Sequence, residues 1–500
     1  MSPPRPRSWV WNEPEDDFMA PAQRLTSLSL AIVALLLLAG CGGSSPLDPP
    51  APLNATDVNL VFVVSEDLAY QAPEDVNPST ANLTNRGLQR ALMMGGFLQQ
   101  HVLGGGNVTS IYALEPTTHL QTANAYPDMV PLETVQQFAM LNLTTQQPQG
   151  NAPFTANSYP LFASYTAGSV PQGVVPQLPL CAPCQGLDFN DQQGDNEALV
   201  SSIIQANTPG FYVFSAPWET ISTLLANINR THSYGLSVPA SYAGPDYVYA
   251  LVIGSSGTAG LVTYNANLNP PSSYPTLPAG KIVSAPCKET FNFRVTGGVG
   301  TAVIPAGTNT NETVYMIRHA EAHPVPYFED GNYVGAGQWR ALDLPNALNG
   351  KIKPDQIYSI DPAIGYAETI GGAPSSYVRP ALTVAPYAIA NNLPLELATS
   401  FAVFDQNAPD LATNASYFFF TGGKFSNKTL LVAWEHNHIP PTINALLSTY
   451  HGGQTVPNWL GSDYDSIWRV KLDGQGNLTV DNSMCEGISS ADLPKTPPQF

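Results

Sequence analysis

Basic residues are scarce in this chain. Its 500 residues include 19 lysines and arginines against 38 aspartates and glutamates, which gives a formal net charge of −19. An acidic protein of this kind repels nucleic acid, and no basic stripe offsets the repulsion. We therefore expect no nucleic-acid partner. If the substrate is an anion, the few arginines have to lie where it binds.

Long hydrophobic runs are missing as well. Residues 28–40 form an apolar run of 13 residues, which is too short to span a bilayer but has the length found in secretory signals. The run ends in Leu-Ala-Gly before Cys41, which resembles the lipobox of bacterial lipoproteins. There the peptide is cut before the cysteine, and the cysteine is lipidated. An ordinary secretory signal with a chance cysteine is the alternative.

The leader sets the first boundaries. Residues 1–41 are expected to be the signal, although the acidic residues at 13–17 suit a signal poorly and translation could begin at Met19. Residues 42–56, which are rich in Gly, Ser and Pro, would form a flexible tether. We therefore expect a protein of the bacterial cell envelope, held on the membrane by lipid at Cys41 and facing the periplasm or the cell surface.

Cysteine is rare, with five residues in the chain. An even number remains without Cys41, which in an oxidising compartment suggests two disulfides. Of the three possible pairings we favour Cys181 with Cys184 and Cys287 with Cys485. The Cys-Ala-Pro-Cys sequence could instead be a redox motif, but it lies in a loop rich in Pro, Gln and Gly, not at a helix start.

Apolar residues, glycine and proline are abundant: the chain is 43% hydrophobic, with 40 glycines and 47 prolines. This composition indicates compact domains joined by many ordered loops. The length suggests two domains of roughly 200 residues each after the leader. We place them at residues 57–285 and 286–490, with the Pro- and Ser-rich residues 269–280 near the boundary.

The two halves share an order of sequence elements. Each has an apolar strand, a Gly-x-x-Arg-Ala-Leu segment, a strand that ends in an acid and a proline, and two further strands. The matched segments are 58–64 and 313–317, 87–92 and 337–342, 110–116 and 356–362, 211–215 and 430–434, and 246–249 and 463–468. This order indicates an internal repeat, and the alternation of strands and helices predicts an α/β domain with a mostly parallel sheet, present twice.

The sharpest chemical signal is Arg318 and His319, which directly follow the strand expected at residues 313–317. Open parallel sheets bind ligands at the carboxyl ends of their strands, and a helix N-terminus there favours anions. The guanidinium could hold a phosphate while the imidazole attacks phosphorus. A second histidine, His436, follows another apolar strand, and Arg379 begins a predicted helix.

Together these pieces resemble the histidine phosphatase superfamily, which includes phosphoglycerate mutases and acid phosphatases. The resemblance covers most of residues 313–480 and implies two tandem three-layer α/β/α domains of the phosphoglycerate mutase type. It implies that His319 is the nucleophile and becomes phosphorylated. Arg318 and Arg379 would bind the phosphoryl oxygens of a phosphorylated small molecule, and His436 would stabilise charge in the transition state.

The sequence departs from the family pattern in places. Alanine follows Arg-His where glycine is usual, and Ala322 stands where acid phosphatases carry a further arginine, for which His323 could partly substitute. The proton donor for the leaving group is the least defined role. Asp405 is our candidate, with Glu321 and Glu435 as alternatives.

Three functions compete. The leading hypothesis is a phosphomonoester hydrolase on the cell envelope that needs neither metal nor cofactor. The second is a lipoprotein that keeps the fold for binding or structure without turnover. The third takes His319, His323, His436 and His438 as metal ligands, since imidazole clusters suit zinc. It ranks last because the neighbouring arginines would repel a cation.

The first half has lost the chemical residues of the second. The alignment places Ser65 and Glu66 opposite Arg318 and His319, Thr118 opposite Arg379, and Pro217 opposite His436. The apolar strands and the Gly-x-x-Arg-Ala segment remain. We therefore predict a catalytically silent first lobe that packs against the second through a fixed interface.

Overall fold

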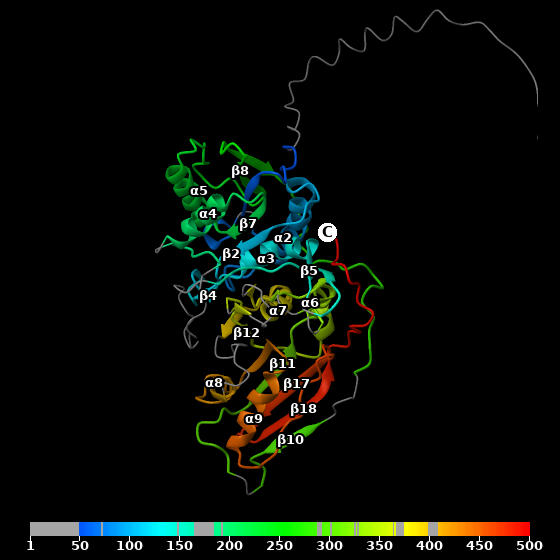
Figure 1. Cartoon of the computed structure of the whole chain (residues 1–500). Coiled ribbons are helices and arrows are strands. Elements are labelled where there is room, and N and C mark those ends of the chain that lie inside the picture. Colours follow the sequence, from blue (N-terminus) through cyan, green and yellow to red (C-terminus); the bar gives the residue numbers. More distant parts are fainter. Residues whose placement is uncertain are drawn as a thin grey trace, which may run out of the picture. The chain divides into compact units, whose positions relative to one another are not determined.

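The computed structural model describes residues 50–71, 74–147, 150–164, 185–191, 194–287, 293–300, 303–324, 327, 330–363, 365–366, 375–398 and 409–500 (Figure 1). Cys41, Cys181, Cys184 and Asp405 lie outside these residues, as do the leader and most of the expected tether. In the part of the chain that is described, no helix combines the length and the apolar character needed to cross a membrane.

The first lobe is built on a five-stranded sheet with the strand order β2-β7-β1-β8-β9. β2, β7 and β1 run parallel, and β8 and β9 continue the sheet antiparallel. Side chains of the central strand alternate between two cores, with Val61 and Val63 on one face and Leu60 and Phe62 on the other. The strands are β1 (Val58–Val64), β2 (Ser110–Ala113), β7 (Gly210–Ala216), β8 (Tyr247–Ile253) and β9 (Ala259–Asn265).

Two helices cover each face of this sheet, which makes the first lobe a three-layer α/β/α unit. α2 and α3 pack on the face of Val61, and α4 and α5 on the face of Phe62. The Thr84 hydroxyl caps α2 by accepting a hydrogen bond from the Gly87 N–H at 3.2 Å. The helices are α2 (Asn85–Phe97), α3 (Val130–Leu141), α4 (Asp195–Ala206) and α5 (Trp218–His232). The short elements are η1 (Leu68–Tyr70), η2 (Leu98–Val102), β3 (Leu120–Gln121), β4 (Tyr126–Pro127), β5 (Leu143–Gln146) and β6 (Phe154–Asn157).

The second lobe has a seven-stranded sheet with the order β10-β18-β17-β11-β16-β12-β15. α6 and α7 cover one face, and α8 and α9 cover the other. The strands are β10 (Arg294–Gly297), β11 (Glu312–Arg318), β12 (Gln356–Ile360), β15 (Leu395–Ala398), β16 (Thr429–Trp434), β17 (Ser466–Leu472) and β18 (Leu478–Cys485). The helices are α6 (Gly335–Leu348), α7 (Arg379–Asn391), α8 (Pro409–Phe420) and α9 (Ile439–Thr449), and β13 (Gly365–Tyr366) pairs with β14 (Ser375–Ser376).

The inner strands of the two sheets follow the same order. Without its outer strands β10 and β15, the second sheet reads β12-β16-β11-β17-β18, which corresponds to β2-β7-β1-β8-β9. The predicted α/β class is confirmed. Each sheet is mixed, because the last two strands of either lobe return as an antiparallel pair beside the central strand.

The Gly-x-x-Arg segment has a packing explanation in both lobes. A Cβ atom on Gly87 would lie 2.2 Å from the carbonyl oxygen of Asp75, and one on Gly337 would lie 2.7 Å from that of Glu321. Glycine is required here because the helix touches the backbone of the preceding loop.

An arginine three residues after that glycine holds the same loop by its side chain. Arg90 forms ion pairs with Asp75 and Asp246. Arg340 is fully buried and forms ion pairs with Glu321, Asp465 and Glu486. The spacing of the motif thus places a close backbone contact and a buried cation on the same face of one helix.

The two lobes belong to one compact unit, Pro49–Phe500. One hydrophobic core contains residues of α2 and α3 together with residues of α6 and α7, for example Phe138 and Leu344. The side-chain amides of Gln136 and Asn332 hydrogen-bond to each other in both directions, at 3.0 and 3.2 Å. Apolar and polar contacts therefore join the first lobe to the second.

A disulfide closes the second lobe. Cys287 and Cys485 are bonded with a Cα–Cα distance of 5.4 Å, which is the pairing favoured by the cysteine count. The bond fixes the segment before β10 to the last residue of β18.

Candidate functional site

His319 lies directly after β11, at the carboxyl edge of the second sheet. Its backbone N–H donates a hydrogen bond to the carbonyl oxygen of Trp434 at 2.8 Å, and the residue is 1% exposed. Ring atom Nδ1 lies 2.7 Å from the carbonyl oxygen of Ala320. Because a carbonyl oxygen only accepts, Nδ1 carries the proton, and the neutral ring keeps its lone pair on Nε2.

Thr383 explains the Arg-x-x-x-Thr spacing of α7. Its hydroxyl donates to the carbonyl oxygen of Arg379 at 2.7 Å and accepts from the Ala320 N–H at 2.9 Å. The threonine thus joins the first turn of α7 to the loop that carries the nucleophile candidate. Arg379 stands at the start of this helix, where the backbone N–H groups also favour an anion.

Two buried guanidinium groups act on His319. Arg318 and Arg379 are 3% and 2% exposed. Burial, together with the positive charges of Arg379 and Arg318, holds the pKa of His319 well below its usual value. The imidazole is therefore neutral near pH 7, which is the nucleophilic form. The same two cations suit this edge of the sheet to an anion.

Two tyrosines that the sequence analysis missed pack against the two arginines and His319. The Arg318 guanidinium lies 3.8 Å from the centre of the Tyr464 ring, and that of Arg379 lies 4.6 Å from the centre of the Tyr377 ring. Each ring lies 6.1 Å from the His319 ring, centre to centre, in an edge-on arrangement. An aromatic residue two positions before the arginine is a signal that could have identified Tyr377. Tyr464 is 146 residues from Arg318, and no local pattern indicates it.

His436 lies beside the loop that binds Arg318. Its Nε2 is 3.5 Å from the position that a Cβ atom on Gly461 would take, and the Gly461 carbonyl oxygen accepts a hydrogen bond from Arg318 at 2.5 Å. The structure therefore brings Arg318, His319 and Arg379 together, with His436 beside the loop that holds Arg318.

Glu435 binds two histidines at once. Its carboxylate forms an ion pair with Nδ1 of His436 and accepts a hydrogen bond from Nδ1 of His438 at 2.9 Å. Burial acts to raise the pKa of Glu435, but the hydrogen bonds from His436 and His438 outweigh it and hold that pKa well below its usual value. The carboxylate is therefore ionised, and it orients both imidazole rings.

The proton donor is not among the two alternatives to Asp405. Glu321 accepts hydrogen bonds from Arg340 Nε at 2.9 and 3.0 Å and from Nη2 at 2.7 Å, so it is a structural carboxylate. Glu435 is held ionised by its two histidines. Both carboxylates are occupied by these partners, which argues against either as the acid. Asp405 stays a prediction because it lies outside the described residues.

The four-histidine metal site is not formed. Nδ1 of His323 contacts Asp330 at 3.2 Å, and His438 is bound by Glu435. Within the described ranges, one group of three residues has ligand atoms that all lie within 4.8 Å of one another: Asp67, His119 and Asp128. All three belong to the first lobe, and the sequence analysis had not singled them out.

Backbone hydrogen bonds correct the predicted correspondence between the lobes. The Ser65 N–H donates to the carbonyl oxygen of Ala216, as the His319 N–H donates to that of Trp434. Ser65, and not Glu66, therefore stands at the place of His319, with Val64 at the place of Arg318. The alignment was wrong by one residue because an apolar strand fits equally well after such a shift.

Two further positions of the predicted alignment between the lobes are also wrong, namely those opposite Arg379 and His436. α3 begins Val-Pro-Leu-Glu-Thr and α7 begins Arg-Pro-Ala-Leu-Thr. Thr134 donates to the carbonyl oxygen of Val130 at 2.7 Å, as Thr383 does to that of Arg379. Val130, and not Thr118, thus matches Arg379. Two residues beyond Ala216 and Trp434, the residue that matches His436 is Trp218 and not Pro217.

Comparison with protein-family models and with curated proteins finds no match. Among solved structures, the chain is similar to a phosphoglycerate mutase from Plasmodium falciparum, at 13% identity over 36% of this chain and 94% of that chain, with a TM-score of 0.22. A mycobacterial glucosyl-3-phosphoglycerate phosphatase is similar at 16% identity over 35% of this chain and 99% of that chain, with a TM-score of 0.24. A phosphoserine phosphatase from Entamoeba histolytica is similar at 15% identity over 37% and 100% of the respective chains, with a TM-score of 0.21. Similarities at these identities and TM-scores establish no function for this chain.

Proposed function

We propose that the second lobe hydrolyses a phosphomonoester through a phosphohistidine on His319. The observation that carries the proposal is a buried, neutral histidine. Its Nδ1 N–H donates a hydrogen bond to a carbonyl oxygen, and burial together with two neighbouring arginines lowers its pKa. This arrangement supplies a nitrogen nucleophile together with a site for the phosphoryl oxygens.

The reaction would proceed in two displacements. Nε2 attacks phosphorus, the bond to the leaving oxygen breaks, and the leaving oxygen takes a proton from an acid for which Asp405 is our candidate. Water then attacks the phosphohistidine and gives a proton to the carboxylate that acted as the acid, which restores the acid. The N–P bond breaks, and phosphate leaves with His319 neutral again. Arg318 and Arg379 stabilise the charge on the phosphoryl oxygens in both steps, and His436 contributes from the edge of the pocket.

A binding role without turnover is the second candidate. The observation that favours it is that both candidate acids already have partners. Glu321 forms an ion pair with Arg340, and Glu435 binds His436 and His438. If no other acid reaches the leaving group, the pocket would hold a phosphorylated molecule without cleaving it.

We also propose that the two lobes are copies of one unit and that the first copy is silent. The matching strand order, the Gly-x-x-Arg contacts and the threonine bond at the start of α3 and α7 support common architecture. Val64, Ser65, Val130 and Trp218 stand where the second lobe has its chemical residues, so the first lobe offers neither the nucleophile nor the arginines.

The test uses the soluble chain from Ser44 onward with a generic phosphomonoester, with and without chelator. Wild type should turn over the substrate in both conditions and form an acid-labile phosphohistidine. His319→Ala should lower kcat by at least about 10³-fold, because the covalent intermediate cannot form. His101→Ala, which changes an exposed histidine of the first lobe, is the matched control and should keep full activity. Full activity in His319→Ala would end the proposal, and bound phosphate without turnover in wild type would favour the binding role.

The location is a separate proposal: a lipid on Cys41 holds the protein on a bacterial envelope membrane. Two or more acyl chains give stable attachment, whereas one alone is marginal. Cys41→Ala should leave the protein unlipidated and release it from membranes. The measurement is metabolic lipid labelling together with membrane fractionation, and unchanged labelling and partitioning would refute the anchor.

A further inference from the structure

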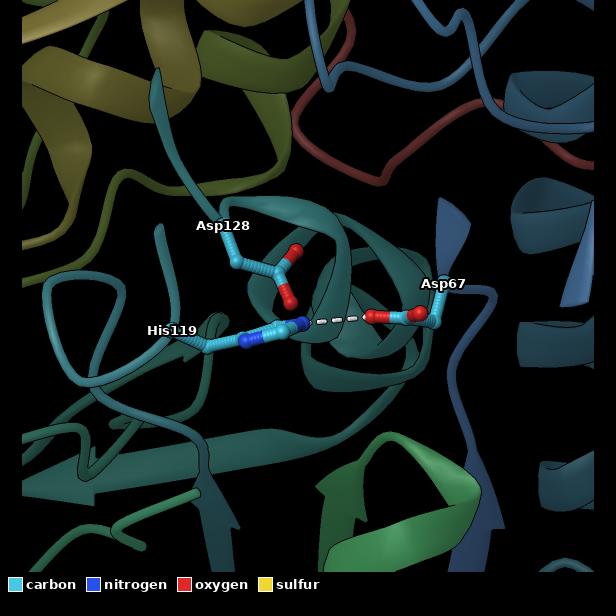
Figure 2. A group of neighbouring side chains, drawn as sticks. All are labelled: Asp67, His119 and Asp128. Atoms are coloured by element: carbon cyan, nitrogen blue, oxygen red, sulfur yellow. Dashed lines mark hydrogen bonds and ion pairs between the residues drawn. The ribbon is translucent and has the colours of Figure 1, made fainter. Parts of the chain in front are cut away.

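Three side chains from separate segments converge at the carboxyl edge of the first lobe's sheet (Figure 2). Asp67 follows β1, His119 follows β2, and Asp128 lies two residues before the start of α3. Figure 2 shows both carboxylates directed toward the His119 ring, with Asp67 joined to it by an ion pair. Asp67 Oδ2 and His119 Nε2 are 2.6 Å apart, and the candidate ligand atoms of all three residues lie within 4.8 Å of one another.

Each of the three groups is held in place by contacts outside the cluster. Asp67 Oδ1 accepts a hydrogen bond from the Ala69 N–H at 2.7 Å, and Asp128 Oδ1 accepts one from the Val130 N–H at 3.2 Å. Each carboxylate therefore keeps its second oxygen for the cluster. The His119 ring stacks on Phe189, with 3.7 Å between the ring centres and 7° between the planes. Such support is what orients ligands in metal sites.

Asp128 takes no part in the ion pair between Asp67 and His119. Asp67 and His119 satisfy each other, but Asp128 Oδ2 has no hydrogen-bond donor within the described ranges, and the residue is 0% exposed. The side-chain amide of Gln121 is close enough to interact with Asp128 as a hydrogen-bond donor would, but its Nε2 and Asp128 Oδ2 do not meet the geometry of a formed hydrogen bond. A buried carboxylate oxygen without a partner is costly, and a cation is the partner that this site lacks.

The charge around the cluster also suits a cation. The strongest electrostatic influences on His119 come from carboxylates: Asp67, Asp128 and Glu219. Glu219 also acts on the neighbouring Tyr70, and its Oε2 is buried without a hydrogen bond to any described residue. At the corresponding edge of the second lobe two arginines, Arg318 and Arg379, lie beside His319, together with one carboxylate, Glu435, that is paired with two histidines. The first lobe thus carries the opposite sign at the place where the second would bind an anion.

We propose that the first lobe binds one divalent transition-metal ion, with Zn²⁺ as the preferred ion, through Asp67 Oδ2, His119 Nε2 and Asp128 Oδ2. One imidazole nitrogen and two carboxylate oxygens suit zinc, whereas Ca²⁺ takes six to eight oxygen ligands. Three protein ligands leave a fourth position for water. The ion links the end of β1, the segment after β2 and the start of α3. This site does not depend on phosphatase activity in the second lobe.

The test is Zn²⁺ binding to the metal-free soluble chain from Ser44 onward, followed by calorimetry and by metal analysis after dialysis. Wild type should bind one Zn²⁺ per chain. Asp128→Asn and His119→Gln should each weaken binding by about 100-fold or more, the upper end of what loss of even an outer-shell partner costs. Both substitutions nearly preserve shape, and circular dichroism checks that the fold is kept.

Control variants separate this proposal from the catalytic one. His101→Ala and His319→Ala should bind Zn²⁺ like wild type, since neither residue belongs to the cluster. The proposal is overturned if wild type binds no stoichiometric Zn²⁺ at micromolar concentration, or if both cluster variants bind normally. It is equally overturned if Glu435→Gln, which changes the histidine pair of the second lobe, abolishes binding while Asp128→Asn does not. Tighter binding of Ca²⁺ than of Zn²⁺ would refute the ion class.

Discussion

His319 is a buried imidazole whose reactivity depends on its immediate neighbours. The Ala320 carbonyl oxygen fixes the proton on Nδ1, and burial with the two arginines disfavours a second proton. The same guanidinium groups that suit a phosphate therefore also keep the nucleophile neutral. In the proposed reaction, phosphate binding and activation of the nucleophile would be coupled, because both follow from the same two charges.

This coupling predicts the pH dependence of kcat/KM. A histidine whose pKa is lowered stays neutral as pH falls, so the acid limb of the profile should lie below the usual histidine value. Arg379→Gln removes one positive charge, raises the pKa of His319 and should move the acid limb to higher pH. It should also lower kcat/KM by about 10²–10³-fold, since loss of such a transition-state contact costs about 2.7–4 kcal/mol.

Arg379→Lys is the matched control for that profile. It keeps the positive charge, so the acid limb should stay near that of wild type, while the loss of the planar fork should still lower kcat/KM. The measurement is the pH profile of kcat/KM for the three proteins with one substrate. An acid limb that stays unchanged in Arg379→Gln would contradict the electrostatic role of Arg379.

At the scale of elements, one helix in each lobe is fixed by a glycine and an arginine. Gly337 allows α6 to touch the loop after β11, and Arg340 binds the Glu321 carboxylate of that loop. Glu321 lies two residues after His319, so this contact sets the course of the chain as it leaves the site. Arg90 and Asp75 make the equivalent contact in the first lobe.

The buried arginine should be essential for stability. Arg340→Leu would leave Glu321 and Glu486 without their cation, which typically costs about 3–5 kcal/mol of unfolding free energy. Urea unfolding near neutral pH measures the change. Arg230→Ala removes an exposed arginine from α5 and should change stability by less than about 0.5 kcal/mol. Equal stability of Arg340→Leu and wild type would show that the cluster is not needed for the fold.

At the scale of the whole molecule, apolar side chains of the two lobes pack into common hydrophobic clusters. Leu92 and Val130 of the first lobe lie in one cluster with Leu342 and Ile389 of the second. Gln137 of α3 donates to the carbonyl oxygen of Pro498 at 2.9 Å, near the end of the chain. Either lobe alone would expose these apolar side chains to water, so activity and binding should be measured on the intact chain.

Shared packing predicts that the two lobes unfold together. In hydrogen exchange followed along a urea series, amides of β1 and β11 should reach the same opening free energy. Arg340→Leu, a change in the second lobe, should accelerate exchange in β1 of the first lobe as well. Arg230→Ala should leave both strands unchanged. Exchange in β1 that does not respond to Arg340→Leu would show that the lobes are independent.

The sequence by itself determined the features that depend on neighbouring residues. The apolar run at residues 313–317 marks the strand before Arg318 and His319, and the Gly-x-x-Arg-Ala-Leu segment at residues 337–342 marks the start of a helix. The strand and helix order gives the α/β class. Strand ends, helix starts and motif spacings are local, so they can be read along the chain.

Tertiary structure alone decided which distant residues meet. Tyr464 reaches Arg318 across 146 residues, and the pairing of β1 with β7, and not the alignment of apolar letters, identified Ser65 as the counterpart of His319. The cluster of Asp67, His119 and Asp128 is invisible in the sequence for the same reason. Each residue is ordinary in its own segment, and only the meeting of three strand and helix ends at one sheet edge gives the group its chemistry.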